Sequence, residues 1–123
     1  MNKQQYEEWV IQADEALQQD TRLFKDEACQ EIYKSYNGYV AALGVSVLMI
    51  GLVPTLSIYY QDKEGVCRRN ILEVIANMIG LGTARQLLEN ALNSTTSRRE
   101  LQKMVIESSI ALKQVVRTYK LVD

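Results

Sequence analysis

The side chains best able to do chemistry, by type and spacing, are basic ones near the end of the chain. On a helical wheel of residues 98–121, with 100° per residue, five of them fall within a sector of about 100°. These are Arg99, Lys103, Lys113, Arg117 and Lys120. Basic side chains a helical turn or two apart can follow the phosphate backbone of a nucleic acid. The same pattern is also typical of a helix face that is simply solvated.

Three aliphatic residues lie in the same sector as these basic residues, namely Ile106, Ile110 and Leu121. A face that only meets water has no need of isoleucines between its lysines, so we interpret the sector as a contact surface for RNA or for a protein partner. A second basic pair, Arg68 and Arg69, is a weaker signal because neighbouring residues point about 100° apart on a helix. The charge is polarised along the chain: residues 1–31 carry three basic and eight acidic side chains, and residues 62–123 carry ten basic and seven acidic.

The residue types needed for catalysis or metal binding are scarce. The chain has no histidine, the commonest general base and metal ligand. Its cysteines, Cys29 and Cys67, are far apart; we expect free thiols, with a disulfide between them as the alternative. The acids of residues 7–15 are expected to form a solvated face. No glycine-rich phosphate loop or nucleophile–base arrangement stands out, so we expect no enzymatic activity, no cofactor and no metal site.

The elements that position the basic residues are expected to be helices. Apolar residues recur at spacings of three and four along most of the chain, and no segment shows the alternation typical of a strand. The spacing predicts helices over residues 3–19, 22–43, 45–50, 52–61, 67–80, 84–92 and 98–121. We therefore predict a single all-α domain over residues 1–123, a compact bundle of six to seven helices with short loops.

A run without any charge extends from Ser35 to Gln61. Roughly 20 apolar residues can cross a membrane, but this run contains Gly44, Gly51 and Pro54, which interrupt a continuous helix. In lipid, such breaks need neighbouring helices to cover the freed backbone groups. We therefore predict that the run lies in the protein core as short helices with a turn at Gly51, and that residues 45–50 form a helix buried on all sides.

Two segments resemble a known family, the small helical subunit of type III-B CRISPR effector complexes (the Cmr complex). The segment of residues 33–63 is similar to the most characteristic stretch of that family. Its matching residues are Tyr33, Ser35, Leu43, Leu48, Ile50, Gly51, Leu52, Leu56 and Tyr59. The end of the chain resembles the closing helix of the family at Ala111, Leu112, Arg117 and Tyr119.

The resemblance spans residues 24–121 and rests mostly on hydrophobic spacing. The chain has Gly44, Ser108 and Val115 where the family often has proline, glutamate and tryptophan. The small subunit of the type III-A (Csm) complex is therefore the alternative within the same resemblance.

The resemblance implies a non-catalytic, cytoplasmic protein that stacks inside an RNA-guided effector filament in antiviral defence. It implies other CRISPR effector subunits and guide or target RNA as partners, and no membrane. It assigns RNA or partner contact to Arg99, Lys103, Lys113, Arg117 and Lys120, with Arg68, Arg69 and Lys34 as second-rank candidates. The uncharged run is expected not to touch the ligand. A helical protein–protein interaction module unrelated to RNA is the alternative function.

Overall fold

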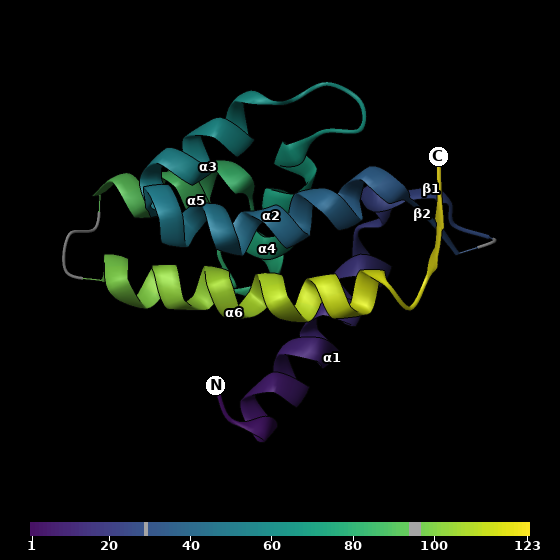
Figure 1. The fold of residues 1–123 in the computed structure, drawn as a ribbon, viewed down its shortest axis with the longest axis horizontal. Helices are drawn as coiled ribbons and strands as arrows, with labels where there is room; N and C mark the ends of the chain where they lie inside the picture. Colours follow the sequence, from purple (N-terminus) through teal and green to yellow (C-terminus); the bar gives the residue numbers. More distant parts are fainter. Residues whose placement is uncertain (29, 94–96) are drawn as a thin grey trace.

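The computed structural model describes residues 1–28, 30–93 and 97–123; Cys29 and residues 94–96 lie outside the described residues. The described residues form six α-helices: α1 (Lys3–Gln19), α2 (Lys34–Ile50), α3 (Leu52–Gln61), α4 (Arg68–Met78), α5 (Ala84–Asn93) and α6 (Arg98–Val116) (Figure 1). A 3-10 turn (Thr21–Leu23) and three short strands, β1 (Phe24–Asp26), β2 (Glu31–Tyr33) and β3 (Lys120–Val122), complete the fold. The predicted helical bundle is confirmed, and the expectation that the chain has no strand is wrong.

The centre of the core is α4, which contacts each of the other five described helices. Its residues Ile71, Leu72 and Ile75 are fully buried, as are Val74 and Ala76. This differs from the expectation that the uncharged run is the central element, because α2 buries only one stripe of its surface. That stripe consists of Tyr36, Val40, Leu43 and Val47.

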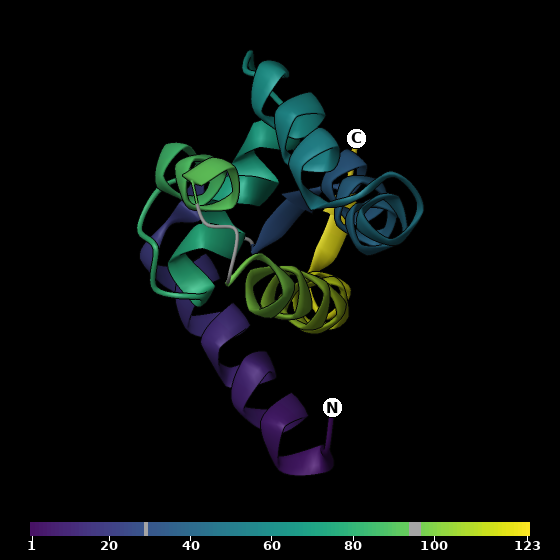
Figure 2. The same ribbon diagram turned by 90° about the vertical axis from the view of Figure 1, so that its left-hand side faces the viewer.

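The first helix, α1, has the predicted bounds. Asn2 and Gln5 form a capping box in which each backbone N–H donates to the other side chain, at 3.2 and 2.8 Å. Ala13, Ala16 and Leu17 are buried against the body of the protein. The N-terminal half of α1 projects away from that body, as Figure 2 shows.

The predicted helix over residues 22–43 is wrong in its first half, where β1 and β2 form an antiparallel hairpin. The third strand, β3, pairs in parallel with β2, which aligns Ile32 with Leu121. Strand order in the sheet is therefore β1-β2-β3. Each strand has three residues, too few to show an alternating pattern, and the partner that stabilises β2 comes from the far end of the chain.

The last helix ends at Val116, whereas the prediction extended it to residue 121. The Thr118 hydroxyl donates to the Val115 carbonyl oxygen at 2.6 Å, and the Thr118 backbone N–H donates to the same oxygen at 2.9 Å, which closes the end of the helix. Beyond it, the Tyr119 ring packs edge-on against Phe24 with ring centroids 5.2 Å apart. The chain therefore leaves the helix and enters β3, which places Lys120 on a strand.

The uncharged run folds into α2 and α3, with the predicted turn at Gly51 (φ 98°). Gly44 does not break α2, which continues from Lys34 to Ile50. A Cβ atom at Gly44 would lie 3.1 Å from Oγ of Ser109, so the glycine lets α2 approach α6 closely. Among the described residues, no helix is both long and apolar enough to span a bilayer.

Candidate RNA and protein interface

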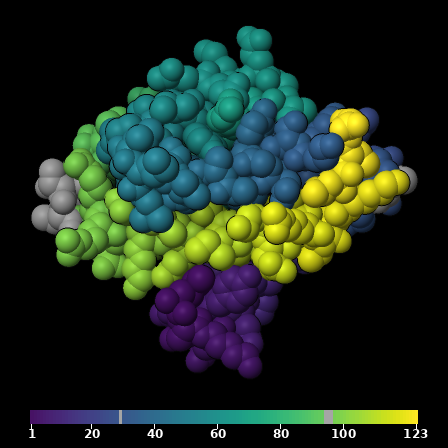
Figure 3. All heavy atoms as spheres, viewed as in Figure 1, coloured from purple at the N-terminus to yellow at the C-terminus, as the bar shows by residue number. Residues whose placement is uncertain are grey.

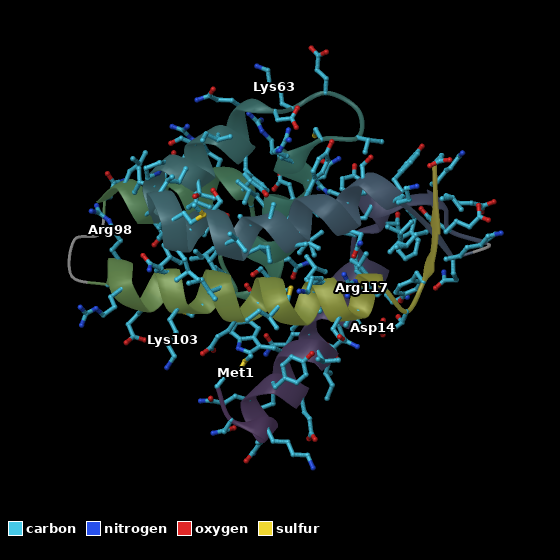
Figure 4. The ribbon with its side chains drawn as sticks, in the orientation of Figure 1. Met1, Asp14, Lys63, Arg98, Lys103 and Arg117 are labelled. Carbon is cyan, nitrogen blue, oxygen red and sulfur yellow. The ribbon has the colours of Figure 1, made fainter. Side chains whose placement is uncertain are left out.

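Three of the predicted basic residues share one side of α6. Arg99 and Lys103 are exposed, and Lys113 is half-buried at the side of α6 that faces α2. None of their three side chains makes a hydrogen bond or an ion pair with another described residue. Figure 4 shows Lys103 projecting from α6 on the side where Met1 lies. We call Arg99, Lys103 and Lys113 the α6 basic row.

Two of the three aliphatic residues of the same sector, Ile106 and Ile110, line hollows on both sides of the row, whereas Leu121 lies on β3. Ile106 is half-buried against the core, and the Ile110 side chain is 42% exposed. A groove of about 160 Å³ between α2 and α6 is lined by Ala41, Val45, Leu48, Ile106, Ile110 and Lys113, among others. A second hollow lies between α6 and the N-terminus, where Met1 meets Arg99, Lys103 and Ile106. Figure 3 shows α2 lying directly above α6 on this face of the molecule.

The other predicted residues near the end of the chain lie beside the small sheet. Nε of Arg117 donates to Oδ1 of Asn37 at 3.2 Å, which holds the guanidinium against α2. Lys120 pairs with Glu31 at 3.4 Å, and Lys34 pairs with Asp123 at 3.5 Å. Lys120 therefore does not continue the α6 basic row, and both lysines have an acidic neighbour.

Arg68 and Arg69 are the first two residues of α4 and so are not part of the α6 basic row. Arg68 donates to Asp62 from its backbone N–H at 2.9 Å and from its guanidinium at 3.2 Å. Nε of Arg69 donates to the Tyr60 carbonyl oxygen at 2.6 Å, and its guanidinium lies 3.6 Å from the centroid of the Tyr60 ring. These contacts hold the loop between α3 and α4 in place, so both arginines have a structural role.

The last two turns of α2 carry exposed apolar side chains that the sequence-based prediction placed in the core. Val45 is 56% exposed, Leu48 69%, Met49 78% and Ile50 49%. The prediction that residues 45–50 are buried on all sides is wrong. A domain of this size cannot surround an outer helix completely, because too little other chain is available to cover it. The signal in the sequence is that α2 has far more apolar residues than one buried stripe requires.

Buried tyrosines join helices to each other. Burial raises the pKa of Tyr36, whose hydroxyl accepts a hydrogen bond from the Asn70 amide at 2.7 Å. Burial also raises the pKa of Tyr59, whose hydroxyl donates to the Tyr39 carbonyl oxygen at 2.7 Å. The rings of Tyr33, Tyr36 and Tyr39 also pack against one another, since consecutive rings meet edge-to-face with centroids 6.2 and 6.1 Å apart.

The part of the chain that the structure describes contains no group of three or more His, Cys, Asp or Glu side chains placed to hold a metal ion. Cys67 is a buried free thiol just before α4. The features that stand out are therefore surfaces: the α6 basic row and an exposed apolar helix face next to it.

The described residues thus form a small, mostly helical fold with one short three-stranded sheet. The fold is similar to that of a CRISPR-associated Cmr5 family protein from Thermus thermophilus, whose crystal structure matches with a TM-score of 0.75. The match covers 98% of this chain and 99% of that chain, at 19% sequence identity, so the likeness is one of fold. No protein-family model matches the sequence, and no curated protein matches it.

Proposed function

We propose that this chain is a non-catalytic small subunit of a type III-B CRISPR RNA-guided effector complex. The observation that carries the proposal is the fold likeness to a Cmr5 family protein over nearly the whole of both chains. Gly51 and Leu52, two of the residues that carry the resemblance, form the turn at which α3 begins. Function follows from a site and not from a fold alone, so the surface must supply further support.

The α6 basic row supports contact with the RNA backbone. From Arg99 to Lys113 the helix rises by about 21 Å, which is long enough to meet several phosphates of one strand. The three charges have no acidic partner among the described residues, so no ion pair has to be broken before they bind phosphate. Contacts of this kind position a strand without reading its sequence, which suits a complex in which guide–target pairing reads the sequence.

The exposed apolar side chains of α2 and the α2–α6 groove support contact with neighbouring subunits inside the filament. Contiguous apolar surface on a small protein usually marks an interaction site. The same surface favours the second candidate function, a protein-interaction module unrelated to RNA. Recovered partners that survive nuclease treatment and include no CRISPR subunit would support that second function.

The experiment that tests RNA contact compares two charge reversals of equal size. Lys103→Glu changes the α6 basic row, and Lys63→Glu changes an exposed loop lysine on the far side of the molecule (Figure 4). RNA affinity should fall with rising salt, and Lys103→Glu should lower it severalfold more than Lys63→Glu does. Equal effects of the two variants, or binding that ignores salt, would exclude the row as the RNA contact.

A further inference from the structure

The surface of α2 that faces solvent lacks any charged residue from Ser35 to Ile50. One row on this surface consists of Gly38, Ala42, Val45 and Met49, which are spaced four, three and four residues apart and so lie along one side of the helix. Together with Ala41, Ser46 and Ile50, these residues line a shallow apolar hollow. We call the row Gly38, Ala42, Val45 and Met49 the α2 face.

The side chains of the α2 face increase in size from one end to the other. At Gly38 an added Cβ atom would meet nothing within 4 Å, so that end is open, whereas Met49 at the other end is 78% exposed. If two such rows pack antiparallel, the large residues of one helix lie over the small residues of the other. Met49 of each copy then fills the space beside Gly38 of the other copy, and Val45 lies opposite Ala42.

Charge also favours a second copy as the occupant. A partner that covers the α2 face must itself be uncharged there, because burying an unpaired charge is costly. The α2 face meets this condition with itself. Lys34 precedes Gly38 by one turn, so antiparallel packing places it beyond the last residue of the other α2. Its charge therefore stays outside the apolar contact.

We propose that the free chain forms a symmetric dimer in which the α2 faces of two copies pack antiparallel. The contact is isologous, the commonest arrangement among homo-oligomers. From Gly38 to Met49 the face is only about 16 Å long, so the interface lies at the small end of the range for specific complexes and the dimer is a weak one. The proposal does not depend on RNA, because the α6 basic row is not part of the contact.

Sedimentation equilibrium of the free chain, from micromolar to near-millimolar concentration, tests the proposal. The chain should pass from monomer to dimer, and Met49→Glu should weaken the dimer at least tenfold. Ile11→Glu is the matched control, because Ile11 is a solvent-accessible apolar residue on α1, 58% exposed and outside the α2 face. A chain that stays monomeric throughout, or a dimer that Met49→Glu and Ile11→Glu affect equally, would overturn the proposal.

Disulfide trapping tests the antiparallel register. A chain with Gly38→Cys and Met49→Cys, in a Cys29→Ser background, should form a covalent dimer on mild oxidation. The two new cysteines are about 16 Å apart along one helix and cannot join within a chain. Either substitution alone should give much less covalent dimer. Equal trapping by the single variants would contradict the antiparallel register.

RNA binding is measured on Met49→Glu in parallel with the sedimentation experiment. A loss of RNA affinity in Met49→Glu without a change in its sedimentation would assign the α2 face to RNA and would overturn its assignment to a second copy. A loss in Lys103→Glu alone, with an unchanged dimer, keeps the α2 face for self-association and the α6 basic row for RNA.

Discussion

The Tyr119 hydroxyl donates a hydrogen bond to Oδ1 of Asp14 at 2.7 Å, and the two residues are 105 positions apart in the sequence. The amide of Gln18 donates to the same hydroxyl oxygen, also at 2.7 Å. Together with the contact of its ring on Phe24, this hydroxyl fastens the end of the chain to α1 and to the small sheet. Tyr119 is thus the link that sets where α6 stops and where β3 begins.

Tyr119→Phe keeps the ring contact and removes the two hydrogen bonds. We expect the free energy of unfolding to fall by about 1 kcal/mol, since the hydroxyl is only partly shielded from water. Tyr119→Ala should cost clearly more, because the ring contact with Phe24 is lost as well. Urea denaturation measures both values. A Tyr119→Ala variant no less stable than Tyr119→Phe would show that the ring does not hold the segment.

The two glycines inside α2 should respond differently to alanine. At Gly38 the added methyl group has open space, so Gly38→Ala should stabilise the monomer by about 1 kcal/mol through helix propensity. At Gly44 the same group meets Oγ of Ser109, which is held by its hydrogen bond to the Ile106 carbonyl oxygen at 2.7 Å. Gly44→Ala should therefore gain little or nothing.

The second half of this test removes the Ser109 hydroxyl, which the methyl group added at Gly44 would meet. In a Ser109→Ala background, Gly44→Ala should recover most of the gain seen at Gly38, which urea denaturation at low protein concentration can measure. If Gly44→Ala were as stabilising in the native background as in the Ser109→Ala background, close approach of α2 and α6 at this point would not be limiting.

Two buried tyrosines and one half-buried tyrosine predict a loss of stability in alkali. Burial raises the pKa of Tyr36, Tyr59 and Tyr119 above the ordinary value of 10.0. Because the folded protein holds the proton more tightly than the unfolded chain, these groups contribute their full stability below pH about 10. That contribution is lost as the pH rises through the folded-state pKa.

Urea denaturation at several pH values between about 8 and 11 measures this loss. Tyr59→Phe is the informative variant, because it removes one titrating group while retaining the ring. Its stability should fall less steeply with pH than that of the native chain, which distinguishes tyrosine ionisation from the general effect of lysine deprotonation. Identical slopes for the two proteins would contradict the assignment.

The lysines beside the sheet should matter less for RNA than the α6 basic row. Lys34 and Lys120 each have an acidic neighbour, Asp123 and Glu31 respectively, which offsets part of their attraction for phosphate. We expect Lys120→Gln to change RNA affinity less than Lys113→Gln does, although both remove one charge. It should also cost less than about 1 kcal/mol of stability, as is usual for an exposed ion pair. Filter binding and urea denaturation measure these effects, and a larger RNA effect at Lys120 would move the RNA contact toward the sheet.

The sequence was sufficient to predict the helices whose periodic patterns are long and uninterrupted. The bounds of α1 and α3 agree with the prediction, and those of α4 and α5 agree to within two residues. The sheet could not be predicted in this way, because its strands have three residues each and β2 depends on pairing with β3 from the chain end. Hydrophobic periodicity is a local signal and does not report such distant pairing.

The candidate site was predictable where it lies within one helix. Arg99, Lys103 and Lys113 share a side of α6 because helical geometry fixes the direction of each side chain. Lys120 was misplaced because the helix ends before it. The exposure of Leu48 and Met49 was missed for another reason: an apolar residue carries no sign of which neighbours will cover it, and the core of this chain is filled by α4 instead.

The most direct test of the proposed function is assembly in the native setting. The chain, carrying an affinity tag, is expressed together with the CRISPR effector subunits and guide RNA of its own host, and the purified material is crosslinked to target RNA. We predict that the chain is recovered with those subunits and the guide RNA. We also predict that crosslinked RNA maps to peptides of α6 between Arg99 and Lys113, and that Lys103→Glu reduces the crosslink while Lys63→Glu does not. Recovery of the tagged chain without any CRISPR subunit or guide RNA would contradict the account.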